Sequence, residues 1–139
     1  MTTPIQQHLI LVDDDSSLRA VLRRGLERAG YEVREAGEGG AALKLLASAA
    51  ADLVITDLVM PDMEGIALIL SLRKSHPKLP VIAMSGGGRM KPEGYLDIAR
   101  NCGAARILTK PCTPAQLVGL VQELIGPRAT RPPTAPVSG

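Results

Sequence analysis

Residues 53–57 read Leu-Val-Ile-Thr-Asp, an apolar run that ends in a carboxylate. Three more runs have this form, at residues 9–12, 81–84 and 107–109, and each is followed at once by a polar side chain. Short apolar runs with helical patterns between them are typical of buried parallel strands. The chain is therefore expected to fold as alternating strands and helices around a parallel sheet, which is the doubly wound α/β class.

The segments between the runs carry helical signals. Leu22 and Leu26 lie at helical spacing after the first run, with Asp15 or Ser16 as the cap and Gly30 as the stop. Strands are predicted at residues 9–12, 31–35, 53–56, 81–84 and 106–109, the second of them at a sheet edge because it alternates polar and apolar residues. Helices are predicted at about residues 16–29, 41–49, 66–76, 93–102 and 114–125.

The composition suits one globular domain, with 139 residues, 45% hydrophobic and 22% charged. The net charge is +2, but Arg128 and Arg131 lie in a tail without acids, so residues 1–126 hold fourteen basic and fourteen acidic side chains. A neutral folded part does not favour a nucleic-acid surface, which needs clustered basic residues. Two Tyr and no Phe or Trp leave little aromatic surface to stack on a base or a flavin.

No targeting segment or membrane span is readable in the sequence. Residues 1–8 hold no cationic stretch, and three Asp at 13–15 end the first apolar run. Cys102 and Cys112 fit neither a CxxC redox motif nor a metal pair. Reduced thiols in a cytoplasmic protein without a membrane partner are therefore expected.

Polar side chains follow four of the predicted strands, namely Asp13 and Asp14, Asp57, Ser85 and Lys110. Ligands of parallel α/β sheets bind in the crevice outside the carboxyl ends of the strands. Any one of these residues alone is more simply a helix cap or a surface side chain. Five of them at four strand ends favour a common site with three carboxylates, a hydroxyl and an ammonium.

The charge of this set indicates what it binds. Two carboxylates ~4 Å apart repel by about 4 kcal/mol at an effective dielectric near 20, and Lys110 neutralises one of three negative charges. Either one acid takes a proton or a divalent cation fills the site. Oxygen ligands without nearby His or Cys favour Mg²⁺. Mg²⁺ beside Lys, Ser and a carboxylate suits phosphoryl transfer, with Asp57 as the nucleophile.

Four segments together carry a resemblance to a known family. They are Val12-Asp13-Asp14-Asp15, the run Asp57-Leu58-Val59-Met60-Pro61-Asp62-Met63-Glu64-Gly65, Ser85 after the fourth strand, and Lys110-Pro111. Over residues 8–126 the chain resembles the receiver domain of bacterial two-component response regulators. The resemblance implies a flavodoxin-like doubly wound (βα)5 domain over residues 1–126, with a five-stranded parallel sheet in the order 2-1-3-4-5. A disordered Pro-rich tail or the start of a linker is expected at residues 127–139.

The resemblance also implies a role for each residue of the predicted site. Asp57 would accept phosphate from a phosphohistidine. The cofactor would be Mg²⁺, bound by Asp14, by Asp57, by the backbone carbonyl of Val59 and, through water, by Asp13. Ser85 and Lys110 would contact the phosphoryl group.

Two further expectations concern the region around Lys110. The resemblance implies a cis bond between Lys110 and Pro111. The family's switch position, three residues before the Lys, is usually aromatic, and here it is Ile107. Because the aromatic relay to the outer face is absent, we expect residues 85–93 and the helix after them to carry the conformational change.

The implied function is that of a signalling domain rather than a turnover enzyme. Its partners would be a sensor histidine kinase or a histidine phosphotransfer protein, and a downstream effector protein. The effector would dock on the face formed by the helix at 93–102, the strand at 106–109 and the helix at 114–125. A stand-alone receiver is preferred, because the chain begins at Met1 and ends in an unstructured tail. The alternative is a fragment of a longer hybrid kinase or transcriptional regulator.

Three other interpretations keep a parallel α/β fold. A flavodoxin-like cofactor binder would need aromatic side chains against the flavin, and only Tyr31 and Tyr95 are present. A Mg²⁺-dependent hydrolase of the Asp-x-Asp type would need a second Asp where Val59 stands. A receiver-like domain that no longer takes phosphate is disfavoured, because all five site residues are present.

Overall fold

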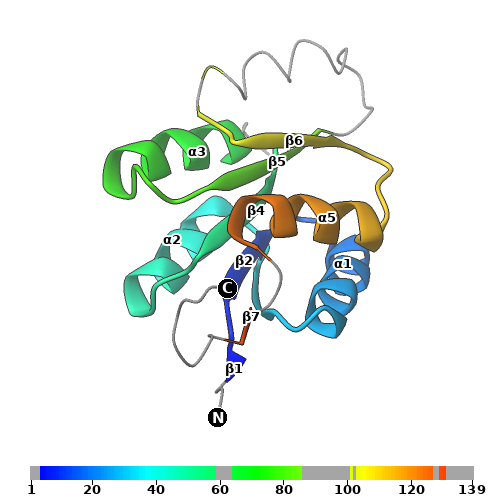
Figure 1. The fold of residues 1–139 in the computed structure, drawn as a ribbon. Coiled ribbons are helices and arrows are strands. Elements are labelled where there is room, and N and C mark those ends of the chain that lie inside the picture. Colours follow the sequence, from blue (N-terminus) through cyan, green and yellow to red (C-terminus); the bar gives the residue numbers. More distant parts are fainter. Residues whose placement is uncertain (1–3, 59–63, 86–100, 102, 127–128, 131–139) are drawn as a thin grey trace.

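The computed structural model describes residues 4–58, 64–85, 101, 103–126 and 129–130. A five-stranded sheet in the order β3-β2-β4-β5-β6 forms its centre, and all neighbouring strands are parallel (Figure 1). The strands are β2 (His8–Val12), β3 (Glu32–Ala36), β4 (Leu53–Asp57), β5 (Val81–Ser85) and β6 (Arg106–Thr109). Numbered by their order along the chain, the strands of this sheet run 2-1-3-4-5, which confirms the predicted topology.

Helices cover both faces of the sheet (Figure 1). The described helices are α1 (Ser16–Arg28), α2 (Gly39–Ser48), α3 (Glu64–Ser75) and α5 (Pro114–Ile125). One core joins the sheet to α2 and α3, and a second core joins its other face to α1 and α5. The longest of these helices has 13 residues, and none in the described part of the chain is long and apolar enough to cross a membrane.

The two cores explain why the inner strands β2, β4 and β5 carry apolar runs. Successive side chains of a strand point to opposite faces of the sheet. In β2, Ile10 and Val12 enter the core beneath α2 and α3, whereas Leu9 and Leu11 enter the core beneath α1 and α5. Because both faces are covered, no position in these strands favours a polar residue until the strand leaves the core.

Local capping signals place the first and last helices. The Asp15 side chain accepts hydrogen bonds from two backbone N–H groups in the first turn of α1. At α5, the Thr113 hydroxyl accepts from the N–H of Gln116 at 3.1 Å, and the Gln116 side chain accepts from the N–H of Thr113 at 2.9 Å. Pro114 occupies the first turn of this capping box, as its fixed φ and missing N–H allow.

Most element boundaries agree with the prediction to within one or two residues. β3 lies at the sheet edge as expected but begins at Glu32. The second helix begins at Gly39 rather than after Gly40, because the Glu38 carbonyl already accepts the first helical hydrogen bond from the N–H of Ala42. Residues 86–100, which hold most of the predicted fourth helix and its entry segment, lie outside the described residues.

A small second sheet is not expected from the sequence. β1 (Pro4–Ile5) pairs antiparallel with β7 (Ala129–Thr130), placing Ile5 opposite Ala129. The backbone after α5 reaches this strand beyond Gly126, whose φ of 82° lies in a region that glycine adopts at little cost. Two residues of the Pro-rich C-terminal segment therefore belong to regular structure, and the rest of that segment lies outside the described residues.

Candidate functional site

The carboxyl ends of four parallel strands meet at one edge of the sheet. Asp13 follows β2, Asp57 is the last residue of β4, Ser85 is the last residue of β5, and Lys110 follows β6 directly. The N–H of Lys110 donates to the carbonyl of Ser85 at 2.7 Å, so the two final strands end level with each other. Polar residues that terminate the apolar runs therefore share one edge, where ligands of such sheets bind.

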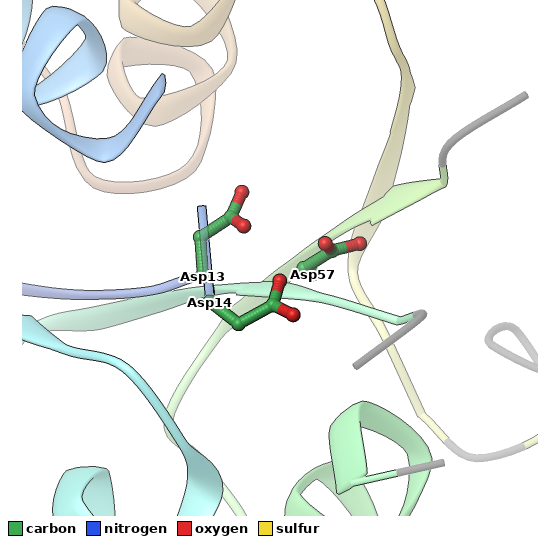
Figure 2. Close-up of side chains that lie close together, drawn as sticks. All are labelled: Asp13, Asp14 and Asp57. Atoms are coloured by element: carbon green, nitrogen blue, oxygen red, sulfur yellow. The ribbon is translucent and has the colours of Figure 1, made fainter. Parts of the chain in front are cut away.

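Three carboxylates form a compact cluster at this edge. One oxygen from each of Asp13, Asp14 and Asp57 lies within 4.8 Å of the others. Figure 2 shows Asp13 and Asp14 next to each other after β2, with Asp57 near them at the end of β4. Asp13 is fully buried and Asp57 is 4% exposed, whereas Asp14 is exposed. Solvent therefore reaches the cluster on the side of Asp14.

Lys110 bridges the two buried acids. Its Nζ donates to Asp13 Oδ2 at 2.9 Å and to Asp57 Oδ2 at 2.9 Å. Burial opposes the charged ammonium, but the hydrogen bonds to Asp13 and Asp57 outweigh that effect and raise the pKa of Lys110 above its usual value. The bridge is therefore cationic at neutral pH.

The donor set fits a hard divalent cation. Three carboxylates and one ammonium leave a formal charge of −2. Two carboxylates about 5 Å apart repel by roughly 3 kcal/mol at an effective dielectric of 20, so a cation between them is stabilised. Ligands that are all oxygen suit Mg²⁺, which usually keeps several waters, and the exposed side of Asp14 leaves room for them.

Ser85 brings a hydroxyl group that lacks a partner. The side chain is fully buried, and its Oγ has no hydrogen bond to any residue that the structure describes. A buried hydroxyl without a partner costs about 1–3 kcal/mol, so it usually marks a strained or functional position. Here it lies at the end of β5, the strand next to the one that carries Asp57.

Asp13 and Asp14 are adjacent in sequence but differ in how they are held. The N–H of Asp13 donates to the Ala36 carbonyl at 3.1 Å, and its Oδ1 accepts from the N–H of Asp15 at 2.9 Å. The carbonyl of Asp13 accepts from Nη1 of Arg19 at 2.5 Å. The Asp14 carboxylate has no hydrogen bond or ion pair to any of the described residues.

Comparison with known proteins settles the family. The model of the response regulator receiver domain matches residues 9–122. The chain belongs to this family. Members are phospho-accepting signalling domains of two-component systems.

Solved structures of receiver domains share the fold. Chemotaxis protein CheY4 of Vibrio cholerae superimposes with a TM-score of 0.78 and 28% identity, covering 87% of this chain and all of that one (100%). The receiver domain of NtrX from Brucella abortus gives a TM-score of 0.76 and 28% identity, covering 84% of this chain and 97% of that one.

Curated relatives of this receiver domain are longer proteins. The DNA-binding transcriptional regulator NtrC of Rhizobium meliloti is 33% identical over 124 residues, which is 89% of this chain and 25% of that protein. NtrC of Escherichia coli K12 is 38% identical over 118 residues, covering 83% of this chain and 24% of the relative. The chain thus spans about a quarter of the length of these relatives.

Close packing at Gly65 positions the end of β4, which carries Asp57. An ideal Cβ on Gly65 would lie 2.0 Å from the Asp57 carbonyl oxygen and 2.6 Å from Cα of Leu58. Only a residue without a side chain therefore lets the start of α3 approach the end of β4 this closely. The sequence offered one signal for this role, the place of Gly65 at the end of the Asp57 motif.

The predicted site residues divide into two groups. The structure brings Asp13, Asp14, Asp57 and Lys110 together, and it places Ser85 at the end of the neighbouring strand. The Lys110–Pro111 peptide is cis, as the family resemblance implies. The roles of these residues in phosphoryl transfer remain predictions.

The structure says less about the two remaining predicted positions, Val59 and Ile107. Val59, predicted to offer its carbonyl to the metal, lies outside the described residues. Ile107 is half-buried and packs against the core beneath α2 and α3. Arg19 was not singled out in the sequence, because a basic residue on a surface helix carries no signal that it reaches back to Asp13.

Proposed function

We propose that Asp57 is the phosphoacceptor of this receiver domain. One carboxylate oxygen of Asp57 attacks the phosphorus of a phosphohistidine, the P–N bond breaks, and its electron pair stays on the imidazole nitrogen. The product is an acyl phosphate on Asp57. The position of Asp57 supports this role, because it ends the central strand of the sheet and belongs to the carboxylate cluster.

The neighbouring residues would stabilise the transferred group. Lys110 Nζ already contacts Asp57 Oδ2 at 2.9 Å, so it lies within reach of a phosphoryl group bound to that carboxylate. The unpartnered hydroxyl of Ser85 would donate to a phosphoryl oxygen. Both contacts would replace solvent with fixed donors where negative charge gathers.

The proposed cofactor is Mg²⁺, held by Asp14, Asp57 and the carbonyl of Val59, with Asp13 contributing through water. When bound, Mg²⁺ would neutralise negative charge on the phosphoryl oxygens. The protein's part is to hold three carboxylates within 4.8 Å of one another against their repulsion.

One observation carries the proposal, the bridge from Lys110 to both buried acids. An ordinary structural ion pair joins one cation to one anion, whereas this site keeps an excess of two negative charges beside a single ammonium. Three N–H donors allow Lys110 to keep Asp13 while it turns from the Asp57 carboxylate to a phosphoryl oxygen. Lys110 can therefore exchange its contact with the Asp57 carboxylate for one with a phosphoryl oxygen.

The partners would be a sensor histidine kinase or a histidine phosphotransfer protein upstream and an effector downstream. The effector would act through the face that includes β6 and α5, either as a separate protein or as a further domain of a longer chain. The DNA-binding activity named for the NtrC relatives belongs to longer proteins, of which this chain spans about a quarter. As part of this proposal we place the domain in the cytoplasm, where a free thiol such as Cys112 stays reduced.

The test is phosphorylation by a small phosphodonor. Wild-type protein incubated with acetyl phosphate and Mg²⁺ is expected to gain the mass of one phosphoryl group, and chelation of Mg²⁺ should prevent the gain. Asp57→Asn should gain nothing. Asp52→Asn is the matched control, because Asp52 binds the N–H of His8 at the opposite end of the sheet and should leave labelling unchanged. Labelling of Asp57→Asn, or none of wild type, would contradict the proposal.

A further inference from the structure

We propose that Arg19 is a positioning residue for the divalent cation, acting through the Asp13 carbonyl to orient the Asp14 carboxylate. This inference rests on the proposed function and extends it to a residue outside the sequence motifs of the site. Arg19 lies on α1, one turn after the acidic segment that follows β2.

The Arg19 guanidinium reaches back from the helix to two fixed acceptors. Its Nη1 donates to the Asp13 carbonyl at 2.5 Å, and its Nε donates to Glu35 Oε1 on β3 at 2.7 Å. The side chain is 18% exposed, and an ideal Cβ on Gly37 would lie 3.6 Å from Nη1. The guanidinium therefore fills the space between the ends of β2 and β3, where its planar fork serves both acceptors at once.

The consequence of this contact falls on Asp14. Asp13 has its own anchors, because its N–H and both carboxylate oxygens are hydrogen-bonded to Ala36, Asp15 and Lys110. The exposed Asp14 carboxylate has no partner among the described residues. Its direction therefore depends on the backbone from which it projects.

The Asp13 carbonyl belongs to that backbone. It shares one planar peptide unit with the N–H of Asp14, so a hydrogen bond that holds the carbonyl also limits rotation of the whole unit. Arg19 supplies this hydrogen bond. Without it, the Asp14 carboxylate would sample a wider range of directions. Metal affinity is sensitive to groups that orient the ligands in this way.

Glu35 holds Arg19 and also binds Arg23. Glu35 Oε2 accepts from Arg23 Nη1 at 2.5 Å, and Arg23 Nε donates to Glu27 at 2.9 Å. The hydrogen bond from Arg23, together with that from Arg19, lowers the pKa of Glu35 against the opposing effect of burial. Two arginines and two glutamates sum to zero formal charge. The network therefore adds little net positive potential at the cation site.

Charge and position make opposite predictions for the loss of Arg19. A positive guanidinium near three carboxylates opposes a bound cation, so if charge alone mattered, its removal would tighten metal binding. If the hydrogen bond to Asp13 orients Asp14, removal of the guanidinium weakens metal binding. The direction of the change in affinity therefore separates the two.

The experiment is a titration of the unphosphorylated protein with Mn²⁺, with free Mn²⁺ measured by electron paramagnetic resonance. Arg19→Gln is expected to bind Mn²⁺ about tenfold more weakly than wild type. Arg19→Lys keeps the charge but lacks the fork, so its affinity should fall by a smaller factor. Arg23→Gln is the matched control, since Arg23 binds the same Glu35 without touching Asp13, and it should bind as wild type does.

Unchanged or higher affinity in Arg19→Gln would overturn the inference. Asp14→Asn tests the metal site itself and should lose Mn²⁺ binding. If Asp14→Asn binds Mn²⁺ normally, the error lies in the proposed metal site and not in Arg19 alone. Circular dichroism reports whether each variant is folded. Should Arg19→Gln fail to fold, Arg19→Lys decides, with weaker binding in support and unchanged affinity against.

Discussion

The two ends of the same sheet are built in different ways. At the amino end, polar side chains bind the backbone of neighbouring elements. Gln7 Nε2 donates to the Ile125 carbonyl and the Tyr31 hydroxyl donates to the Gly126 carbonyl, each at 2.8 Å. At the carboxyl end, Asp13 and Asp57 share the Lys110 ammonium while the Asp14 carboxylate lies beside them, and the buried Ser85 hydroxyl has no partner among the described residues.

Ser85 is not the sole residue with a buried side-chain atom that lacks a partner in the described part of the chain. Gln7 Oε1 and Arg73 Nε are also buried without a partner in the described part of the chain. Each belongs to a side chain with other hydrogen bonds: Gln7 Nε2 donates to the Ile125 carbonyl, and Nη1 and Nη2 of Arg73 donate to the carbonyls of Pro77 and Leu79. Ser85 differs because its one side-chain polar atom is the one left over.

The difference shows where stability and function reside in this domain. A neutral hydrogen bond contributes about 1 kcal/mol to the free energy of unfolding, and the amino end gathers several of them. The carboxyl end holds like charges and a hydroxyl without a partner among the described residues, which under the proposed function would gain partners from a cation and a phosphoryl group. Ligands that bind only the folded protein should therefore stabilise this end most.

The largest expected effect comes from disturbing the geometry of the carboxyl end. Gly65→Ala would place a Cβ 2.0 Å from the Asp57 carbonyl oxygen, which forces α3 and β4 apart. We expect the free energy of unfolding to fall by about 3 kcal/mol, at the upper end for overpacked sites, and phosphorylation of Asp57 to be lost or strongly slowed. Urea unfolding and intact-mass labelling measure the two effects.

A second glycine provides the control for Gly65. An ideal Cβ on Gly119 in α5 would meet no atom within 4 Å. Gly119→Ala should raise the free energy of unfolding by about 0.5–1 kcal/mol, because alanine favours the helix, and it should leave labelling unchanged. If Gly65→Ala behaved like Gly119→Ala, the close approach at Asp57 would have no importance for the fold.

A smaller loss is expected from the amino end. Tyr31→Phe keeps the buried ring, which is 1% exposed, and removes the hydroxyl that binds the Gly126 carbonyl. The free energy of unfolding should fall by about 1–1.5 kcal/mol, while phosphorylation of Asp57 proceeds at the wild-type rate. A large fall in labelling of Tyr31→Phe would mean that the two ends of the sheet are energetically coupled.

The exposed acid of the cluster should give a small effect of the opposite sign to that of Tyr31→Phe. Asp14→Asn removes one of three clustered carboxylates without taking a partner from Lys110. In the absence of divalent cations we expect the free energy of unfolding to rise by about 1 kcal/mol, less at high salt because the charge is exposed. Lower stability in Asp14→Asn would show that repulsion in the cluster is not a cost to the folded state.

The same two ends differ in how far the sequence predicts them. At the carboxyl end each polar residue directly follows an apolar run, so strand direction alone brings Asp13, Asp57, Ser85 and Lys110 to one edge. At the amino end, pairs such as Tyr31 and Gly126 are neutral groups far apart in the chain. No spacing or composition marks such a pair, and β1 with β7 escaped prediction for the same reason.

The sequence by itself determined the fold class, the strands of the parallel sheet, the family and the members of the charged cluster. Burial on both faces leaves continuous apolar runs, so the strands and the polar residues that end them can be read from the pattern. The family follows from the motifs around Asp14, Asp57, Ser85 and Lys110. Only the tertiary structure decided that Lys110 joins Asp13 to Asp57, that Gly65 lies against the Asp57 carbonyl, and that Arg19 holds the Asp13 carbonyl. These contacts depend on distances between separate elements, which are set by packing of the whole domain.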